Sequence, residues 1–356
     1  MPPFSLAAAS DTLPEPAFEF GEMGLENLNF YELHGYFDAQ FEVDNKDAAG
    51  KISDFDVQRF NIVTTFNISE RAVALAEIEY EHGIEHAGGE GVGEINLERG
   101  QLQLRLSKNH NLVVGKFLTP YGIYNLIHDF SVTYLFTKLP FSLYDKHPNA
   151  VGKNERVYPK YLAGVQVNGN FPLTTGNVEY WAFVANGPGA SPYEADDNAN
   201  KAAGFRLRYA DALEKIKIGA SFYRGQNGNA AHSLQQLLAG DIELNLGKLQ
   251  LQSETSLNQF DRLNESLKKT GSHRKAVGYY LQGSLSLAGR FYPFLRYDRY
   301  DRDTAAANDA ESEVTAGLNI GITRDVFVKV ENHFRRGQAA GFNSHELFVA
   351  SIAAGF

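Results

Sequence analysis

Apolar and polar residues alternate along most of this chain in short segments separated by polar connections. In residues 30–43, for example, Phe37 and Phe41 fall on one face of an extended chain, and Asp38 and Gln40 on the other. A period of two residues is typical of a β-strand with one apolar and one polar face. The pattern recurs at residues 30–43, 59–68, 74–80, 101–106, 113–117, 165–168, 178–182, 205–209, 216–222, 241–246, 249–258, 279–287, 291–298, 314–322, 326–335 and 346–356. The sequence therefore predicts an all-β protein of about sixteen strands.

The two faces of these strands need different surroundings. Their polar faces carry charges in strand after strand, such as Arg206, Arg208 and Glu243, and such faces need water. Their apolar faces need a non-aqueous partner, but no amphipathic helix and no second sheet remains to cover them. Lipid outside a closed sheet and water inside it satisfy both faces and leave no unpaired edge. We therefore expect a transmembrane antiparallel β-barrel rather than a soluble sandwich.

The connections between the predicted strands support a barrel that spans a membrane. Short turns lie near residues 67–71, 107–111, 172–176, 211–215, 246–248, 287–290 and 323–325. Long connections lie at 44–54, 82–93, 119–160, 187–201, 225–233, 261–275, 301–312 and 337–344. Alternation of short and long connections is typical of membrane barrels with short turns on one side and longer loops on the other.

The longest connection, Thr119 to Lys160, is unusual because it is rich in aromatic and aliphatic residues. A loop this long in a compact domain is usually functional, and an apolar loop must pack against something. We expect this third long loop to fold into the barrel and narrow a pore. The expected organisation is an N-terminal tail at 1–27, a barrel at 28–356 and a constriction loop at 119–160.

Composition narrows the possible functions. The 356 residues include 18 Tyr, 25 Phe and no Cys, and the formal net charge is −10. The absence of Cys excludes disulfide scaffolds, thiolate metal sites and thiol nucleophiles, and the negative charge argues against nucleic-acid binding. No apolar run approaches the roughly 18 residues of a membrane helix. Within the tail, Leu6–Ala9 could be the last part of a signal peptide or simply part of a flexible terminus.

The strand series, the alternating loop lengths and the C-terminal Phe356 resemble the bacterial outer-membrane porins, in the general or phosphate-selective branch. The ending 347–356 resembles the final-strand signal that the barrel assembly machinery reads. This resemblance implies a passive diffusion channel in the outer membrane of a Gram-negative bacterium, with a third loop that constricts the lumen and no cofactor. It also implies a homotrimer in which residues 82–93 latch onto a neighbouring subunit. The expected partners are outer-membrane lipid, lipopolysaccharide and small hydrophilic solutes.

In general porins, acids on the inward loop face a ladder of basic residues on the barrel wall. The resemblance therefore implies that Asp129 and Asp145 are the loop acids and that Arg59, Arg105 and Lys116 form the ladder. Three further charged or titratable loop residues are candidates for the constriction: Lys138, Lys146 and His147. Such a transverse field favours polar solutes over apolar ones. The alternative is that these charges only form salt bridges that hold the loop down.

A phosphate- or anion-selective pore would instead need clustered Lys and Arg with few acids nearby. Arg206, Arg208, Lys217 and Arg296 are candidates for such a cluster on the later strands. Acids also occupy those polar faces, namely Glu179, Asp241, Glu243, Glu254 and Asp298. The sequence therefore favours a general diffusion pore over an anion-selective one.

Other functional classes find weaker support. His82 and His86 match the H-x-x-E-H spacing of some zinc peptidases, but the surrounding glycines disfavour the helix that this chemistry requires. Outer-membrane lipases use a Ser–His pair, and no such pair stands at a recognisable spacing, so we do not expect an enzyme. A structural barrel that sheathes an electron-transfer partner would need an open lumen, which a bulky inward loop opposes.

Overall fold

The computed structural model describes residues 31–45, 52–81, 94–127, 131–148, 154–187, 199–226, 233–264, 266, 268–337 and 344–356. The predicted tail at 1–27, the predicted latch at 82–93 and Asp129 therefore lie outside the described residues. Among the residues described, no helix is long and apolar enough to cross a membrane.

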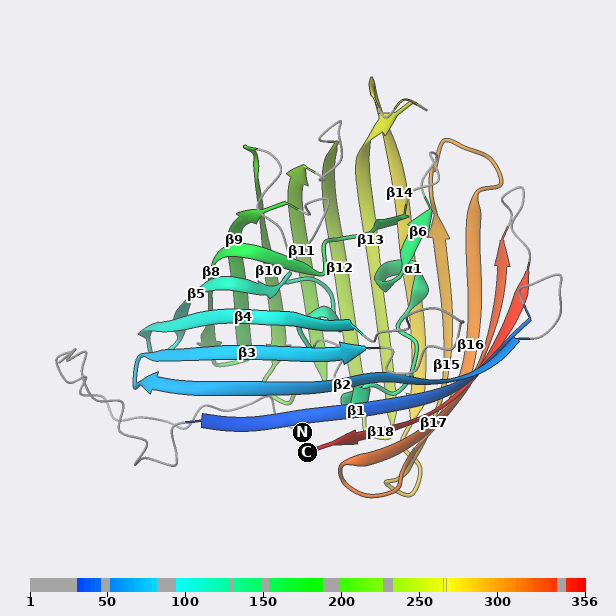
Figure 1. The fold of residues 1–356 in the computed structure, drawn as a ribbon, viewed down its shortest axis with the longest axis horizontal. Coiled ribbons are helices and arrows are strands. Elements are labelled where there is room, and N and C mark those ends of the chain that lie inside the picture. Colours follow the sequence, from blue (N-terminus) through cyan, green and yellow to red (C-terminus); the bar gives the residue numbers. More distant parts are fainter. Residues whose placement is uncertain are drawn as a thin grey trace.

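Sixteen antiparallel strands close into a barrel, as the alternation of residues predicts (Figure 1). Their bounds are β1 (Tyr31–Asp44), β2 (Ile52–Ser69), β3 (Ala72–Glu81), β4 (Glu94–Ser107), β5 (His110–Leu118), β8 (Tyr161–Leu173), β9 (Gly176–Asn186), β10 (Lys201–Asp211), β11 (Ile216–Gln226), β12 (Leu234–Leu246), β13 (Leu249–Leu263), β14 (Lys269–Leu285), β15 (Phe291–Asp301), β16 (Ala310–Gly321), β17 (Val326–Gly337) and β18 (His345–Gly355). Each strand pairs with its neighbours in sequence, and β18 pairs with β1. The predicted fold class and strand number are confirmed.

The barrel is apolar outside and polar inside, the reverse of a soluble protein. Every barrel strand presents at least one large exposed apolar side chain: Leu33, Phe60, Ile78, Leu97, Val114, Val165, Val184, Leu207, Ile218, Leu238, Leu257, Leu281, Leu295, Val314, Phe334 and Ile352. Charged and polar residues on the opposite faces are buried, including Arg206, Arg296 and Lys329. Only a hydrocarbon environment stabilises such an outer surface, so the barrel is a transmembrane one.

The barrel closes where the chain ends. The amide and carbonyl groups of Gly35 and Phe356 exchange hydrogen bonds of 2.9 and 3.0 Å, and the Phe356 ring stacks on Phe60 with centroids 5.9 Å apart. A Cβ atom on Gly35 would lie 2.3 Å from this ring, so only glycine leaves room for it. The terminal aromatic residue thus covers the β1–β18 seam.

The prediction of one long connection is wrong. The sequence predicts a connection at 261–275, but Asp261 pairs with His273 and Leu263 pairs with Lys269, so the β13–β14 hairpin continues almost to its tip. It rises above the neighbouring strands in Figure 1. The hydrophobic alternation fades there because a hairpin beyond the hydrocarbon region can be polar on both faces, whereas its backbone pairing persists.

Candidate functional site

The segment 119–160, here called the inward segment, leaves β5 after Leu118 and returns to the wall at Tyr161. It contains η1 (Asn125–Ile127), η2 (Ser131–Thr133), α1 (Phe141–Tyr144), β6 (Lys146–Pro148) and β7 (Asn154–Arg156). α1 lies against β14 and β15, within the ring of strands (Figure 1). The segment's side chains and backbone contact residues of β1, β12, β13 and β15–β18 that face the lumen. Its path therefore crosses the interior.

Aromatic packing holds the inward segment against the wall. Tyr124, Tyr134 and Phe136 are almost fully buried and touch one another, with ring centroids 5.1–5.7 Å apart. Phe136 also packs on Phe294 of the wall, 6.2 Å away. Fully burying one such aromatic side chain contributes roughly 1.5–3 kcal/mol. The segment thus has a hydrophobic core of its own inside a polar barrel.

Wall donors hold the segment's carbonyl groups. The ammonium group of Lys329 donates to the carbonyls of Ser131 and Phe136, the latter at 3.0 Å. The side-chain amide of Asn319 donates to the carbonyl of Tyr134 at 3.2 Å. Lys329 is almost fully buried, so these carbonyls supply hydrogen bonds that its charge requires.

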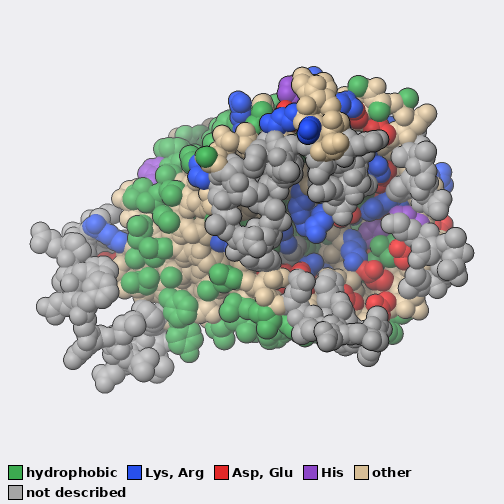
Figure 2. Space-filling view, turned by 45° about the horizontal axis from the view of Figure 1, so that its top comes forward, with side chains coloured by type: hydrophobic (Ala, Val, Ile, Leu, Met, Phe, Trp, Pro, Cys, Tyr) green, Lys and Arg blue, Asp and Glu red, His purple; other side chains and the backbone are tan. Residues whose placement is uncertain are grey.

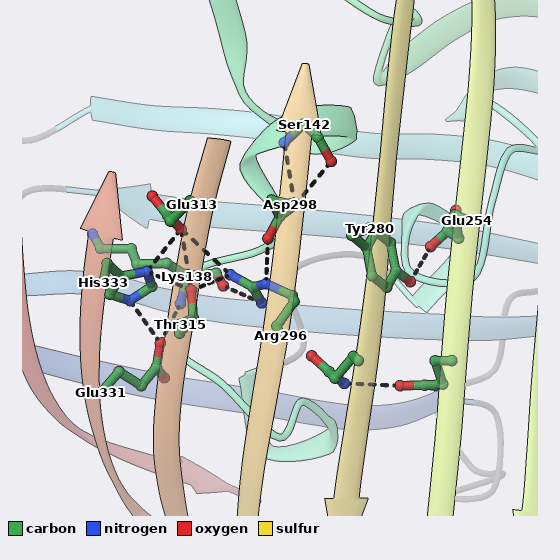
Figure 3. A network of polar contacts seen from close by, with 12 residues as sticks. Lys138, Ser142, Glu254, Tyr280, Arg296, Asp298, Glu313, Thr315, Glu331 and His333 are labelled. Atoms are coloured by element: carbon green, nitrogen blue, oxygen red, sulfur yellow. Dashed lines mark hydrogen bonds and ion pairs between the residues drawn. The ribbon is translucent and has the colours of Figure 1, made fainter. Parts of the chain in front are cut away.

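Wall carboxylates accept the segment's N–H and O–H groups (Figure 3). Glu331 accepts from the backbone amide of Thr137, and Asp298 accepts from the hydroxyl of Ser142 at 2.8 Å. Behind them, Arg296 binds Asp298 at 2.7 Å. His333 lies between two carboxylates, with Nδ1 3.0 Å from Glu313 and Nε2 3.1 Å from Glu331. The wall is therefore a connected polar network built to receive the segment.

Replacing Glu254 by Ala should loosen the inward segment. Its carboxylate accepts hydrogen bonds from the Tyr144 hydroxyl at 2.8 and 2.9 Å and from the Tyr280 hydroxyl at 2.6 Å. Without it both buried hydroxyls lose an acceptor, at about 1–3 kcal/mol each. We expect a lower thermal unfolding midpoint in detergent and faster proteolysis within 119–160. Glu254→Gln keeps an acceptor and should lie between Ala and the native protein. Glu179→Ala, on the part-exposed Arg208 pair, is the control and should change neither.

A cavity of about 190 Å³ lies between the inward segment and the β2–β3 wall. The wall contributes Arg59 and Glu81, and the segment contributes Arg156 and Lys160. The remaining lining residues are Tyr124, Asn125, Tyr134, Leu139, Tyr144 and Tyr158. In Figure 2, Lys and Arg side chains gather at the centre of the hollow at the long-loop end, and Asp and Glu side chains lie towards its right side. Among the described residues, the charged side chains that line this cavity are three cations and one carboxylate.

Of the predicted basic ladder, only Arg59 lines this cavity. Its guanidinium lies 3.9 Å from the carboxylates of both Asp38 and Glu81. Arg105 lies at the other end of the barrel, next to the short turn after β4, and its amide donates to the carbonyl of Arg71 in the neighbouring turn. The inward segment begins at the opposite end of β5, so Arg105 is not part of the constriction.

Lys116 takes the outer face of β5, contrary to the sequence analysis. Val113 and Phe117 are almost fully buried inside the barrel, and the alternation then turns Lys116 outward, opposite the exposed Ala163. Its ammonium group lies 4.6 Å from the centroid of the Tyr161 ring. The reason is that the inward segment creates an apolar interior, so apolar residues of this strand pack inside.

The loop candidates have separate roles. Lys138 pairs with Glu42 of β1, and Asp145 lies 3.9 Å from Arg335 of β17. Lys146 is exposed, and its backbone amide donates to the Asp145 carboxylate at 2.8 Å. None of these residues lines the cavity. The first two instead pair with charges of the wall, as the alternative of packing salt bridges proposed.

His147 is a packing residue. Its ring stacks on Tyr300 at 3.6 Å and is 3% exposed. Burial, followed by the nearby positive charges of Arg335 and Arg302, lowers the pKa of His147 to about 3. The imidazole is therefore neutral at physiological pH and adds no charge to the constriction.

The predicted basic cluster on the later strands is neutralised by acids. The pairs are Arg206–Asp241 at 2.6 Å, Arg208–Glu179 at 2.6 Å, Lys217–Glu214 at 3.4 Å and Arg296–Asp298 at 2.7 Å. Three of these acids, Asp241, Glu179 and Asp298, are among those predicted on the same faces, whereas Glu214 lies in the turn before β11. Each of the four basic residues is thus paired with a carboxylate of its own surroundings.

Sequence reasoning missed Arg156 and Lys160, although both lie in the segment that it selected. A signal was present for Lys160, which directly precedes a wall strand and is therefore fixed close to the wall. Arg156 carried no comparable signal, because β7 is a short strand paired only with β6 inside the lumen.

Comparison with known proteins agrees with this geometry. No family model matches the sequence, and no curated protein matches it. Among solved structures, an anion-selective porin from Comamonas acidovorans has a TM-score of 0.66 at 15% identity, covering 92% of this chain and 99% of that one. The chain has the porin fold. OmpF of Salmonella typhi, in a complex with daunomycin, has a TM-score of 0.63 at 10% identity, and the channel DcaP of Acinetobacter baumannii has 0.57 at 11%; each alignment covers 92% of this chain and 97% of the other.

This porin fold confirms the predicted resemblance at the level of architecture, including an outer-membrane type of barrel. The H-x-x-E-H motif at 82–86 lies outside the described residues. Among the described residues, no group of three or more His, Asp or Glu side chains could hold a metal ion.

Proposed function

We propose that this protein is a passive diffusion channel of the bacterial outer membrane for small hydrophilic solutes, with a preference for anions. The observation that carries the proposal is the lining of the cavity beside the inward segment. Among the described residues of this lining, three cations, Arg59, Arg156 and Lys160, accompany one carboxylate, that of Glu81. Positive charge that lines a low-dielectric passage attracts anions and repels cations.

This arrangement differs from the transverse field implied by the porin resemblance. In that arrangement the loop carries acids and the wall carries bases. Here the loop side of the cavity carries Arg156 and Lys160, and the acid Glu81 belongs to the wall beside Arg59. Arg59 lies between two wall carboxylates, whereas Arg156 and Lys160 bring positive charge to the segment side of the cavity. Anion preference is therefore supported by residues different from those that the sequence suggested.

The likeness to the anion-selective porin of Comamonas acidovorans supports the same function. A barrel that sheathes a partner protein is less consistent with the contacts, since the inward segment reaches strands on several sides of the lumen. The homotrimer and the association with lipopolysaccharide remain predictions. One neighbour of similar fold, OmpT of Vibrio cholerae, is described in a trimer form.

The reversal potential of the purified protein in a planar bilayer tests this proposal. With a potassium chloride gradient across the membrane, an anion-preferring channel gives a reversal potential of the sign set by chloride. We expect steps of open-channel current and a reversal potential of the chloride sign. Bilayers that show no steps with correctly folded protein would reject the channel, and a potential of the potassium sign would reject the anion preference alone.

A further inference from the structure

We propose that the cavity beside the inward segment is a binding site for aromatic carboxylates, a class of which benzoate is the simplest member. This inference rests on the proposed channel function and names a class of solute that the channel would select. The tyrosine side chains of the lining point to this class, because a general anion pathway does not require them.

The tyrosines that line the cavity contribute ring carbon to its surface rather than free hydroxyl groups. The Tyr124 hydroxyl donates to Gln252 at 2.7 Å, and the Tyr144 hydroxyl donates to Glu254. The Tyr134 hydroxyl donates to the Tyr124 carbonyl at 3.3 Å, and the Tyr158 hydroxyl donates to Asn125 at 3.1 Å. All four hydroxyls are engaged within the protein, so these tyrosines present ring carbon to the cavity, beside the side chains of Asn125 and Leu139.

These rings are held in place before any solute arrives. Tyr158 stacks on Tyr121 with centroids 3.9 Å apart and meets Tyr144 edge to face at 5.8 Å. Tyr144 in turn packs against Tyr124 at 5.7 Å. A rigid aromatic wall loses little conformational entropy when it binds a second ring, and offset or edge-to-face contacts between rings are favourable.

The cations stand next to this aromatic wall. Arg156 donates to the carbonyl of Tyr144 at 3.0 Å, which ties its guanidinium to the tyrosine cluster. Guanidinium and ammonium groups form strong charge-assisted hydrogen bonds with carboxylates. A solute with a carboxylate at one end and a flat ring at the other therefore matches both parts of the lining. Inorganic anions and sugars would use the charges or donors and gain nothing from the rings.

The size of the cavity agrees with this class. Its volume is about 190 Å³, and an apolar cavity of about 150 Å³ is known to hold a benzene molecule. One ring with a carboxylate fits, whereas a fused three-ring system would have to displace the inward segment.

The test is the block of single-channel current by three small solutes at neutral pH. Benzoate carries both the ring and the charge, acetate carries the charge alone, and benzyl alcohol carries the ring alone. We expect benzoate to reduce the potassium chloride current at concentrations at which the other two solutes do not.

Variants of the cavity residues then test whether benzoate binds at this location. Arg156→Gln and Tyr158→Leu should each weaken the benzoate block about tenfold, measured against the variant's own chloride current. The control is Tyr180→Leu, because Tyr180 packs on His110 and Phe171 near short turns; this variant should keep the block. Heat-dependent gel mobility verifies that each variant is folded.

The outcomes separate the two proposals. Equal effects of benzoate and acetate on a conducting channel would overturn the aromatic site and leave the channel function intact. A benzoate block that survives in both cavity variants would overturn this location. Folded protein that conducts no chloride would overturn the channel function, and the aromatic site with it.

Discussion

Deleting residues 131–143 and joining the ends with a short Gly-Ser linker should raise the single-channel conductance severalfold. These residues include Tyr134, Phe136 and Phe141, whose buried rings fill the lumen together with the wall. The wall groups that they contact, such as Lys329 and Asp298, would become hydrated, which a polar barrel interior tolerates. Conductance follows the narrowest cross-section of the aqueous path, so removing the filling material must increase it. Bilayer recordings in potassium chloride measure the change.

The control is a deletion of equal length within residues 187–200, a long connection that lies between wall strands. This control deletion should leave the conductance near its native value. If the two deletions had equal effects, or if removing 131–143 left the conductance unchanged, the inward segment would not control the passage. Both variants should keep the heat-dependent gel mobility of a closed barrel, because the sixteen wall strands remain.

The barrel was predictable because its evidence is spread over the whole chain. One alternating strand such as residues 30–43 fits a soluble sandwich as well as a barrel, whereas sixteen strands with alternating connection lengths fit few other folds. The exception at 261–275 has a physical reason. Alternation reports a boundary between water and lipid, so it disappears where a hairpin such as β13–β14 is wet on both faces, although its pairing continues.

The site was only partly predictable, because the evidence for it is not spread over the whole chain. Sequence patterns show which face of a strand is apolar, but they do not show whether an apolar face meets lipid or the packed inward segment. The alternation puts Phe117 on the lipid face and Lys116 on the lumen face. In the structure Phe117 packs with Phe183 inside the barrel, and Lys116 takes the outer face. The position of Arg156 depends on how the segment folds back on itself through β6 and β7, and no local pattern encodes that path.

Neutralising the three cavity cations together, in the variant Arg59→Gln, Arg156→Gln and Lys160→Gln, should change the preference from anions to cations. Of the described lining residues, Glu81 is then the one that still carries a charge. At a separation of about 5 Å and an effective dielectric constant of about 20, one unit charge changes the energy of a passing ion by about 3 kcal/mol. This exceeds the thermal energy several times, so the reversal potential in a salt gradient should change sign.

The matched control replaces Arg105 and Lys116 by Gln. This removes two positive charges that do not line the cavity. The reversal potential of this double variant should stay close to the native value. The two variants thus compare charge inside the passage with charge elsewhere on the barrel. A triple variant that still prefers anions, or a double variant that loses this preference, would mean that solutes follow a route different from the cavity between the inward segment and the β2–β3 wall. Salt dependence adds a second criterion, because the selectivity conferred by the cavity cations should weaken as added salt screens their field.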